Sequence, residues 1–162
     1  MLNRTVLVVQ GVHIFCNHNL LYFHSPYEEE NKWLSNTKKT DVQGYIQLPD
    51  KGEKLIITSS LKDVMCLYAA GYNAIAMQSE MQIPHESLIS ELKDRFKVIE
   101  VLYDNDFDKE SNPGQRVASQ ICDLYGFNNI CIPSEFKSKD PSDLISNVGN
   151  FNELKNIINE QR

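Results

Sequence analysis

The pattern of apolar and polar positions changes near residue 50 of this 162-residue chain. Before that point, short apolar runs at 5–9, 13–16 and 20–23 are separated by turn-forming residues, which is typical of antiparallel strands. After it, short apolar runs alternate with segments whose apolar residues recur every three or four positions, which is typical of strands alternating with helices. We therefore expect a β-rich subdomain over residues 1–50 and an α/β domain over residues 51–162.

The α/β part is predicted to contain four strands with helices between them. The expected strands are 55–58, 74–77, 97–103 and 129–132, and the expected helices begin at Leu61, Pro84, Pro113, near Asp140 and at Asn152. Ser60 is a suitable N-cap for the first helix, and Gly71 is suited to end it. Strands separated by helices in this way form a parallel sheet with right-handed crossovers. The predicted fold class is thus α/β, with a Rossmann-like parallel sheet of about four strands flanked by helices.

Two carboxylates follow the strand at 97–103. Asp104 and Asp106 are alternate residues, and alternate side chains of an extended chain point the same way, so both are expected to face one point beyond the strand. Open α/β sheets bind ligands at this carboxyl edge. Two hard oxygen ligands, joined by a third carboxylate from elsewhere, suit Mg²⁺. The alternative is that the pair only caps the strand and begins a turn.

Composition narrows the class of protein. Hydrophobic residues make up 41% of the chain, enough for a folded core, and the net charge of −6 argues against a protein that coats polyanions through its overall charge. The four cysteines, at positions 16, 66, 122 and 131, form no C-x-x-C pair, which argues against a zinc ribbon. Cys66, Cys122 and Cys131 lie inside apolar patterns and are interpreted as buried thiols in a reducing cytoplasm. The N-terminus has no signal-peptide pattern, and no apolar run reaches the about 18 residues of a membrane span.

Residues 54–145 resemble the TOPRIM domain, the metal-dependent catalytic module of bacterial and phage primases, topoisomerases and some nucleases. Four ordered segments carry the resemblance: Lys54–Met65, Leu67–Ala76, Tyr103–Asp106 with its D-x-D motif, and Lys139–Asp143. The segment Gln43–Pro49 is also similar to the lead-in to this module in primases. Within the family, the chain looks most like primases of phages and phage-like replication systems.

The resemblance implies a site for Mg²⁺ (or Mn²⁺) held by Asp104, Asp106 and Asp140. Asp140 precedes Pro141 and is equally suited to be a helix N-cap, and the two roles are compatible. Asp63 stands where TOPRIM domains often keep an aspartate, but its place in the first turn of a helix explains it without a function.

The chain departs from the family pattern at two places. Ser59 and Ser60 stand where the first motif normally ends in Glu-Gly, and a serine hydroxyl is a poor general base near neutral pH. Glu80 follows the second strand on the same edge, so we expect it to replace the missing glutamate in part; the alternative is a solvated loop acid. Ser59 and Glu80 are therefore the candidate catalytic residues. The second departure is at 107–114, where primases have a small Ala-Gly pair and this chain has a longer, charged loop.

Basic residues near the same edge are candidates for binding nucleic-acid phosphates. Each alone is more often a solvated surface charge, and their interest comes from their grouping in an otherwise acidic chain. They are Lys62, Lys109, Arg116, Lys137 and Lys139.

The resemblance implies a primase-type enzyme of DNA replication that makes phosphodiester bonds with single-stranded DNA and nucleotides. The sequence has no zinc ribbon and no P-loop, so we expect it to work with other replication proteins, such as a helicase or a zinc-binding subunit. The alternatives are a TOPRIM nuclease, or a non-catalytic metal- and nucleic-acid-binding or assembly subunit, because Ser59 replaces the first-motif glutamate. The expected location is the cytoplasm, that of the host if the chain comes from a phage.

Overall fold

The computed structural model describes residues 5–9, 12–17, 20–24, 33–35 and 37–161, which fall into two compact units, residues 1–41 and 42–162. In the first unit, four strands form an antiparallel sheet in the order β1-β2-β3-β4. They are β1 (Thr5–Val9), β2 (Val12–Asn17), β3 (Leu20–His24) and β4 (Trp33–Ser35). The strands predicted from the first three apolar runs are confirmed, and the residues that join β2 to β3 lie outside the described set.

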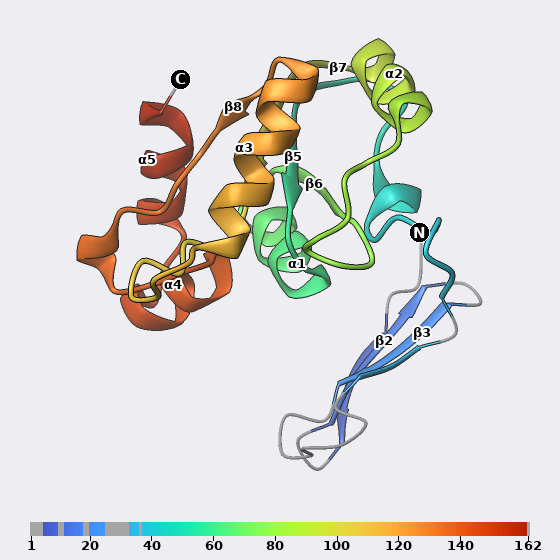
Figure 1. Cartoon of the computed structure of the whole chain (residues 1–162). Helices are drawn as coiled ribbons and strands as arrows, with labels where there is room; N and C mark the ends of the chain where they lie inside the picture. The colour runs from blue at the N-terminus through green and yellow to red at the C-terminus, as the bar shows by residue number, and fades with distance from the viewer. Residues whose placement is uncertain (1–4, 10–11, 18–19, 25–32, 36, 162) are drawn as a thin grey trace. The chain divides into compact units, whose positions relative to one another are not determined.

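The second unit is an α/β fold built on a four-stranded parallel sheet with the order β6-β5-β7-β8 (Figure 1). Its strands are β5 (Gly52–Thr58), β6 (Asn73–Ala76), β7 (Phe96–Leu102) and β8 (Asn128–Asn129). Its helices are α1 (Leu61–Ala69), α2 (Glu86–Arg95), α3 (Pro113–Tyr125), α4 (Pro141–Val148) and α5 (Asn152–Glu160), with 3₁₀ turns η1 (Tyr45–Gln47) and η2 (Ser134–Phe136). The predicted fold class is confirmed.

The division between the units falls after Asp41, whereas the sequence pattern placed it at residue 50. The segment in between packs on the α/β unit. Gln43 forms an antiparallel bridge with Ala76 at the edge of the sheet, with N–H to oxygen distances of 2.8 and 3.0 Å. Leu48 is buried in the same core as the strands. Residues 42–50 therefore belong with the α/β unit because they cover an edge strand that would otherwise expose its peptide groups.

The sheet is buried on both faces. Along β5, Leu55 and Ile57 pack with α2 and α3, whereas Ile56 between them packs with α1, α4 and α5. This alternation explains why the strand is a continuous apolar run, as parallel strands with helices on both faces usually are. The run predicted at 129–132 forms a shorter ladder than expected, but Ile130 and Ile132 are fully buried.

Three of the four strands, β5, β6 and β7, end level with one another at their carboxyl ends. Thr58 of β5 is paired with Ala76 of β6 and with Leu102 of β7. The residues that follow, including Ser59 and Asp104, therefore leave the sheet at one edge. This edge is where an open α/β sheet binds its ligands.

Three cysteines of the second unit are free thiols. Cys66, Cys122 and Cys131 are half-buried rather than fully buried as expected, and burial raises the pKa of each thiol. None of the helices in the described part of the chain combines the length and the hydropathy that crossing a bilayer requires.

Candidate metal centre

Main-chain contacts bring two distant segments together at the carboxyl edge. The N–H of Asn105, just after β7, donates to the carbonyl of Lys139 at 2.7 Å. This bond holds Asp140, the N-cap residue of α4, beside Asp104. Because the contact is made by the backbone, the approach of the two aspartates does not depend on side-chain rotamers.

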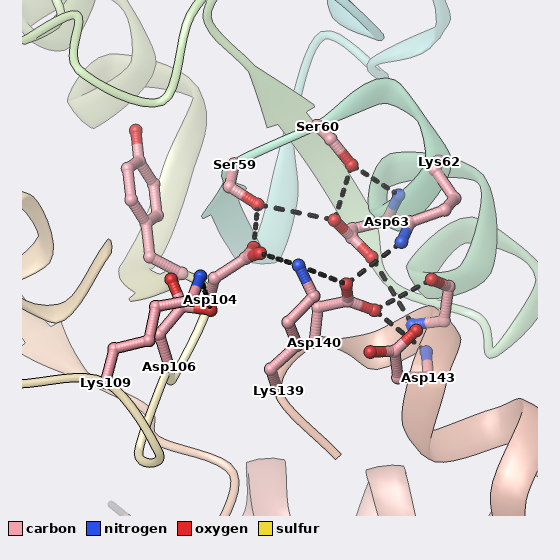
Figure 2. A network of polar contacts seen from close by, with 12 residues as sticks. Ser59, Ser60, Lys62, Asp63, Asp104, Asp106, Lys109, Lys139, Asp140 and Asp143 are labelled. Atoms are coloured by element: carbon pink, nitrogen blue, oxygen red, sulfur yellow. Dashed lines mark hydrogen bonds and ion pairs between the residues drawn. The ribbon is translucent and has the colours of Figure 1, made fainter. Parts of the chain in front are cut away.

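Three aspartates converge at this edge: Asp63 from the first turn of α1, Asp104 from the end of β7, and Asp140 (Figure 2). One ligand oxygen from each lies within 4.8 Å of the others. Asp140 also caps α4, since its Oδ1 accepts from the N–H of Asp143 at 2.8 Å. The N-cap interpretation of Asp140 is thus correct, and the second carboxylate oxygen remains directed at the cluster.

Asp63 is the most strongly perturbed member of the group. It is 1% exposed, and its carboxylate accepts from the hydroxyls of Ser60 at 2.5 Å and Ser59 at 3.3 Å. Burial, followed by the negative charge of Asp140, raises the pKa of Asp63 to about 7. At Asp140 burial acts in the same direction, but the hydrogen bond from Asp143 and the Lys62 ammonium outweigh it, so the pKa of Asp140 lies below its usual range.

Ser59 is a hydrogen-bond donor in this site. Its hydroxyl lies 2.5 Å from Asp104 Oδ1 and 3.3 Å from Asp63 Oδ2, and one hydroxyl proton serves these two acceptors. A hydroxyl held in this way orients carboxylates rather than accepting a proton. The catalytic role of Ser59 stays a prediction.

Asp106 lies outside the group of three. The N–H of Phe107 donates to the carbonyl of Asn105 at 2.8 Å, so the chain turns at Asp106 and the alternation of an extended strand no longer applies. The buried carboxylate of Asp106 pairs instead with the ammonium group of Lys109 at 2.8 Å, as Figure 2 shows. The structure therefore does not bring both carboxylates of the D-x-D motif to one point, and metal ligation by Asp106 stays a prediction.

Two asparagines anchor the longer loop after the D-x-D motif through hydrogen bonds. Asn112, the N-cap of α3, accepts from the N–H of Asp106 at 3.1 Å and donates to Asn105 Oδ1 at 2.7 Å. Asn105 is buried and donates to the carbonyl of Ile132 at 2.9 Å. The loop is thus joined to the scaffold at both ends, and its first anchored residue, Asn105, directly follows Asp104.

Glu80 lies at the same edge, as predicted. Its Oε1 is buried and has no hydrogen-bond partner among residues 37–161. Burial, followed by the charges of Asp104 and Asp106, raises the pKa of Glu80. A Cβ added to Gly114 would lie 2.4 Å from the carbonyl oxygen of Asp104 and 2.6 Å from Glu80 Oε1. The absence of a side chain at position 114 therefore leaves the space that Glu80 and the Asp104 backbone share.

Gly114→Ala is expected to lower the free energy of unfolding by roughly 2 kcal/mol, because the new methyl group clashes with backbone that cannot move. A glycine-to-alanine change at an unstrained helical position normally stabilises by about 0.4–1 kcal/mol, so the sign is diagnostic. Urea unfolding followed by far-ultraviolet circular dichroism measures the change. Ser119→Ala, exposed on the same helix, is the control and is expected to have little effect. A Gly114→Ala protein as stable as the original would contradict the close contact.

The predicted lysines pair with the aspartates of this edge. Lys62 lies 2.9 Å from Asp140, Lys139 lies 3.0 Å from Asp104, and Lys109 contacts Asp106 as described above. Arg116 and Lys137 are exposed and lie outside this network. Sequence reasoning named Asp63 but gave it no function. The signal for its role was its position in the first helical turn after β5, which begins at the same edge as Asp104.

The donor set fits a small divalent cation. Carboxylate oxygens are the ligands that Mg²⁺ and Mn²⁺ prefer, and each of the three aspartates contributes one. Including their neighbours, the edge carries more carboxylates than ammonium groups. The acids are Asp63, Glu80, Asp104, Asp106, Asp140 and Asp143, and the cations are Lys62, Lys109 and Lys139. A bound cation would offset this excess of negative charge.

No protein-family model matches the sequence, and comparison with curated proteins finds no match. Solved structures of primases do match. The DnaG catalytic core gives a TM-score of 0.70 at 14% identity, covering 93% of this chain and 53% of that one. The DnaG primase catalytic domain bound to single-stranded DNA gives 0.64 at 15% identity, covering 92% of this chain and 53% of that one.

A third match comes from a phage assembly, the bacteriophage T7 lagging-strand DNA polymerase interacting with primase domains bound to an RNA/DNA hybrid and dTTP. Its TM-score is 0.59 at 14% identity, covering 99% of this chain and 82% of that one. The chain spans about half the length of the two DnaG structures. At this level of identity the similarity establishes the fold, and the chain has the TOPRIM fold found in DNA primase catalytic cores.

Proposed function

We propose that this chain is the cation-binding TOPRIM module of a DNA-primase-like protein of DNA replication. The observation that carries the proposal is the convergence of Asp63, Asp104 and Asp140 at the ligand-binding edge of a primase-type fold. Two of the matched structures hold single-stranded DNA or an RNA/DNA hybrid with dTTP, which supports single-stranded DNA and nucleotides as the partners.

In this proposal Asp104 and Asp140, together with Asp63, hold Mg²⁺ (or Mn²⁺), and Asp106 flanks the site. The bound cation neutralises phosphate charge and polarises a phosphoryl oxygen. Lys62, Lys109 and Lys139 supply positive charge for the phosphates of template and nucleotide.

Other replication proteins, such as a helicase or a zinc-binding subunit, belong to the proposal. The chain spans about half of the DnaG structures, and the third match is a polymerase–primase assembly. Replication of a phage genome is also part of the proposal, and it rests on the sequence resemblance to phage primases.

A second candidate is a module that binds cation and nucleic acid without catalysis. The hydrogen bonds from Ser59 to Asp104 and Asp63 favour it, because a hydroxyl that donates to carboxylates is not placed to take a proton from a nucleophile. If the chain is an enzyme, Glu80 is the carboxylate at this edge that would take the proton from the nucleophile. Its raised pKa brings it nearer to the operating pH of a general base.

Calorimetric titration with Mg²⁺ and Mn²⁺ tests the proposal. The wild-type protein is expected to bind, and Asp104→Asn/Asp140→Asn is expected to bind at least about a hundredfold more weakly because two of three ligands lose their charge. Asp108→Asn, an exposed acid in the same loop, is the matched control. Single-stranded DNA and nucleoside triphosphates are then added to the same samples. Turnover identifies the enzyme, binding without turnover identifies the second candidate, and a wild-type protein that binds no cation overturns both.

A further inference from the structure

The ammonium group of Lys139 lies between two of the proposed cation ligands. Its Nζ is 3.0 Å from Asp104 Oδ2 and 3.9 Å from Asp140 Oδ2, and Figure 2 shows it between these carboxylates. Both aspartates belong to the group whose ligand atoms lie within 4.8 Å of one another. An ammonium group and a divalent cation therefore compete for the same oxygens.

The main chain of Lys139 is fixed while its side chain is not enclosed. Its carbonyl accepts from Asn105 N–H at 2.7 Å, and the next residue caps α4. The side chain is 43% exposed, so the ammonium group can turn into solvent by rotamer changes alone. Displacing it disturbs neither α4 nor the bond that holds Asp140 beside Asp104.

We propose that Lys139 is an internal counter-ion of the metal centre, which holds Asp104 and Asp140 together in the cation-free protein and turns to a nucleic-acid phosphate when a divalent cation displaces it. This inference rests on the proposed function, because it assumes that the aspartates bind the cation. Its consequence is a positive coupling: the cation releases a lysine for phosphate, and a bound phosphate holds that lysine away from the aspartates. By linkage, each ligand then strengthens the binding of the other by the same factor.

The neighbouring lysines provide the comparison. Lys62 also contacts Asp140 Oδ2, at 2.9 Å, and is a partial competitor. Within the described residues Lys109 pairs only with Asp106, which is outside the group of three, and its side chain is 57% exposed. Lys109→Gln removes the same charge from the same edge without emptying the space between the ligands, so it is the matched control.

The first experiment titrates Mn²⁺ into the protein without nucleic acid. Lys139→Gln is expected to bind Mn²⁺ about fivefold more tightly than wild type, because the competing charge is gone. Lys139→Arg, which keeps the charge, is expected to bind like wild type, and Lys109→Gln is expected to show a smaller gain than Lys139→Gln. Unchanged or weaker binding by Lys139→Gln, with a wild-type protein that does bind, overturns this inference alone. A wild-type protein that binds no Mn²⁺ overturns the proposed function.

The second experiment measures the affinity for a single-stranded oligodeoxythymidine with and without Mg²⁺, by fluorescence anisotropy. With Mg²⁺ present, Lys139→Gln is expected to bind about threefold more weakly than wild type, since one phosphate contact is lost. Without Mg²⁺ the same change is expected to have no effect, because Lys139 is then held by the aspartates. An equal loss under both conditions would make Lys139 a permanent phosphate contact and would overturn the exchange.

Discussion

Lys54→Met is expected to lower the free energy of unfolding of the α/β unit by roughly 3–5 kcal/mol, the cost of leaving a buried charge unpaired. The Nζ of Lys54 lies 2.5 Å from Oε2 of Glu100, whose side chain is 1% exposed. The two residues lie on the neighbouring central strands β5 and β7, and Lys54 also donates to the carbonyl of Ile158 in α5 at 3.4 Å. Methionine fills similar space but leaves the carboxylate of Glu100 without its counter-charge.

Urea unfolding followed by far-ultraviolet circular dichroism measures this loss, because the α-helices assigned in the described residues all belong to the second unit. Lys97→Met is the control: its partner Glu53 is exposed, and such pairs contribute about 1 kcal/mol or less. The double change Lys54→Met/Glu100→Leu is expected to regain most of the loss, since no charge then remains buried. A Lys54→Met protein no less stable than Lys97→Met would show that the pair contributes nothing to stability.

The second large effect is on the pH dependence of stability. Without divalent cation, the protein is expected to lose stability as the pH rises from about 4 to about 7. The folded-state pKa of Asp63 is raised, by burial and then by Asp140, to about 7, whereas an unfolded chain has a value near 4. Between these values the folded state binds more protons than the unfolded state, so stability falls with rising pH. The full difference corresponds to roughly 4 kcal/mol at most.

Asp63→Asn is expected to remove most of this slope and to make the cation-free protein more stable than wild type at the upper end of the range. Asp94→Asn, an exposed acid on α2, is the control and is expected to keep the wild-type slope. Mg²⁺ is expected to restore wild-type stability at high pH, since a ligand bound only by the folded state stabilises it. A wild-type slope that survives in Asp63→Asn would show that Asp63 is not the group responsible.

Local patterns predicted the fold well because strands and helices are selected by short-range periodicity. The apolar run Leu55–Ile57 predicted a strand of the parallel sheet, which the structure confirms and shows to be covered on both faces. Ser60 was correctly identified as the N-cap of α1 from its residue type. The carboxyl edge also followed from topology, which placed Asp104 there, and the resemblance to TOPRIM domains added Asp140. The structure brings these two aspartates into one group.

Other features depend on contacts between segments far apart in the chain. That Asp63, and not Asp106, groups with Asp104 and Asp140 depends on the turn at 105–107 and on the docking of α4 beside α1. There Ser142 N–H donates to Asp63 across 79 positions. The division after Asp41 likewise required the bridge from Gln43 to Ala76.

The sequence by itself determined the α/β class, the order of strands and helices, and the edge at which the acidic residues gather, because these depend on hydrophobic period and chain direction. Only the tertiary structure decided which carboxylates lie close enough together to share a cation, which lysine stands between two of them, and that residues 42–50 belong with the α/β unit. The reason is that a metal site requires ligand atoms from separate elements to lie within a few ångströms of one another, and no local pattern of residues sets those distances.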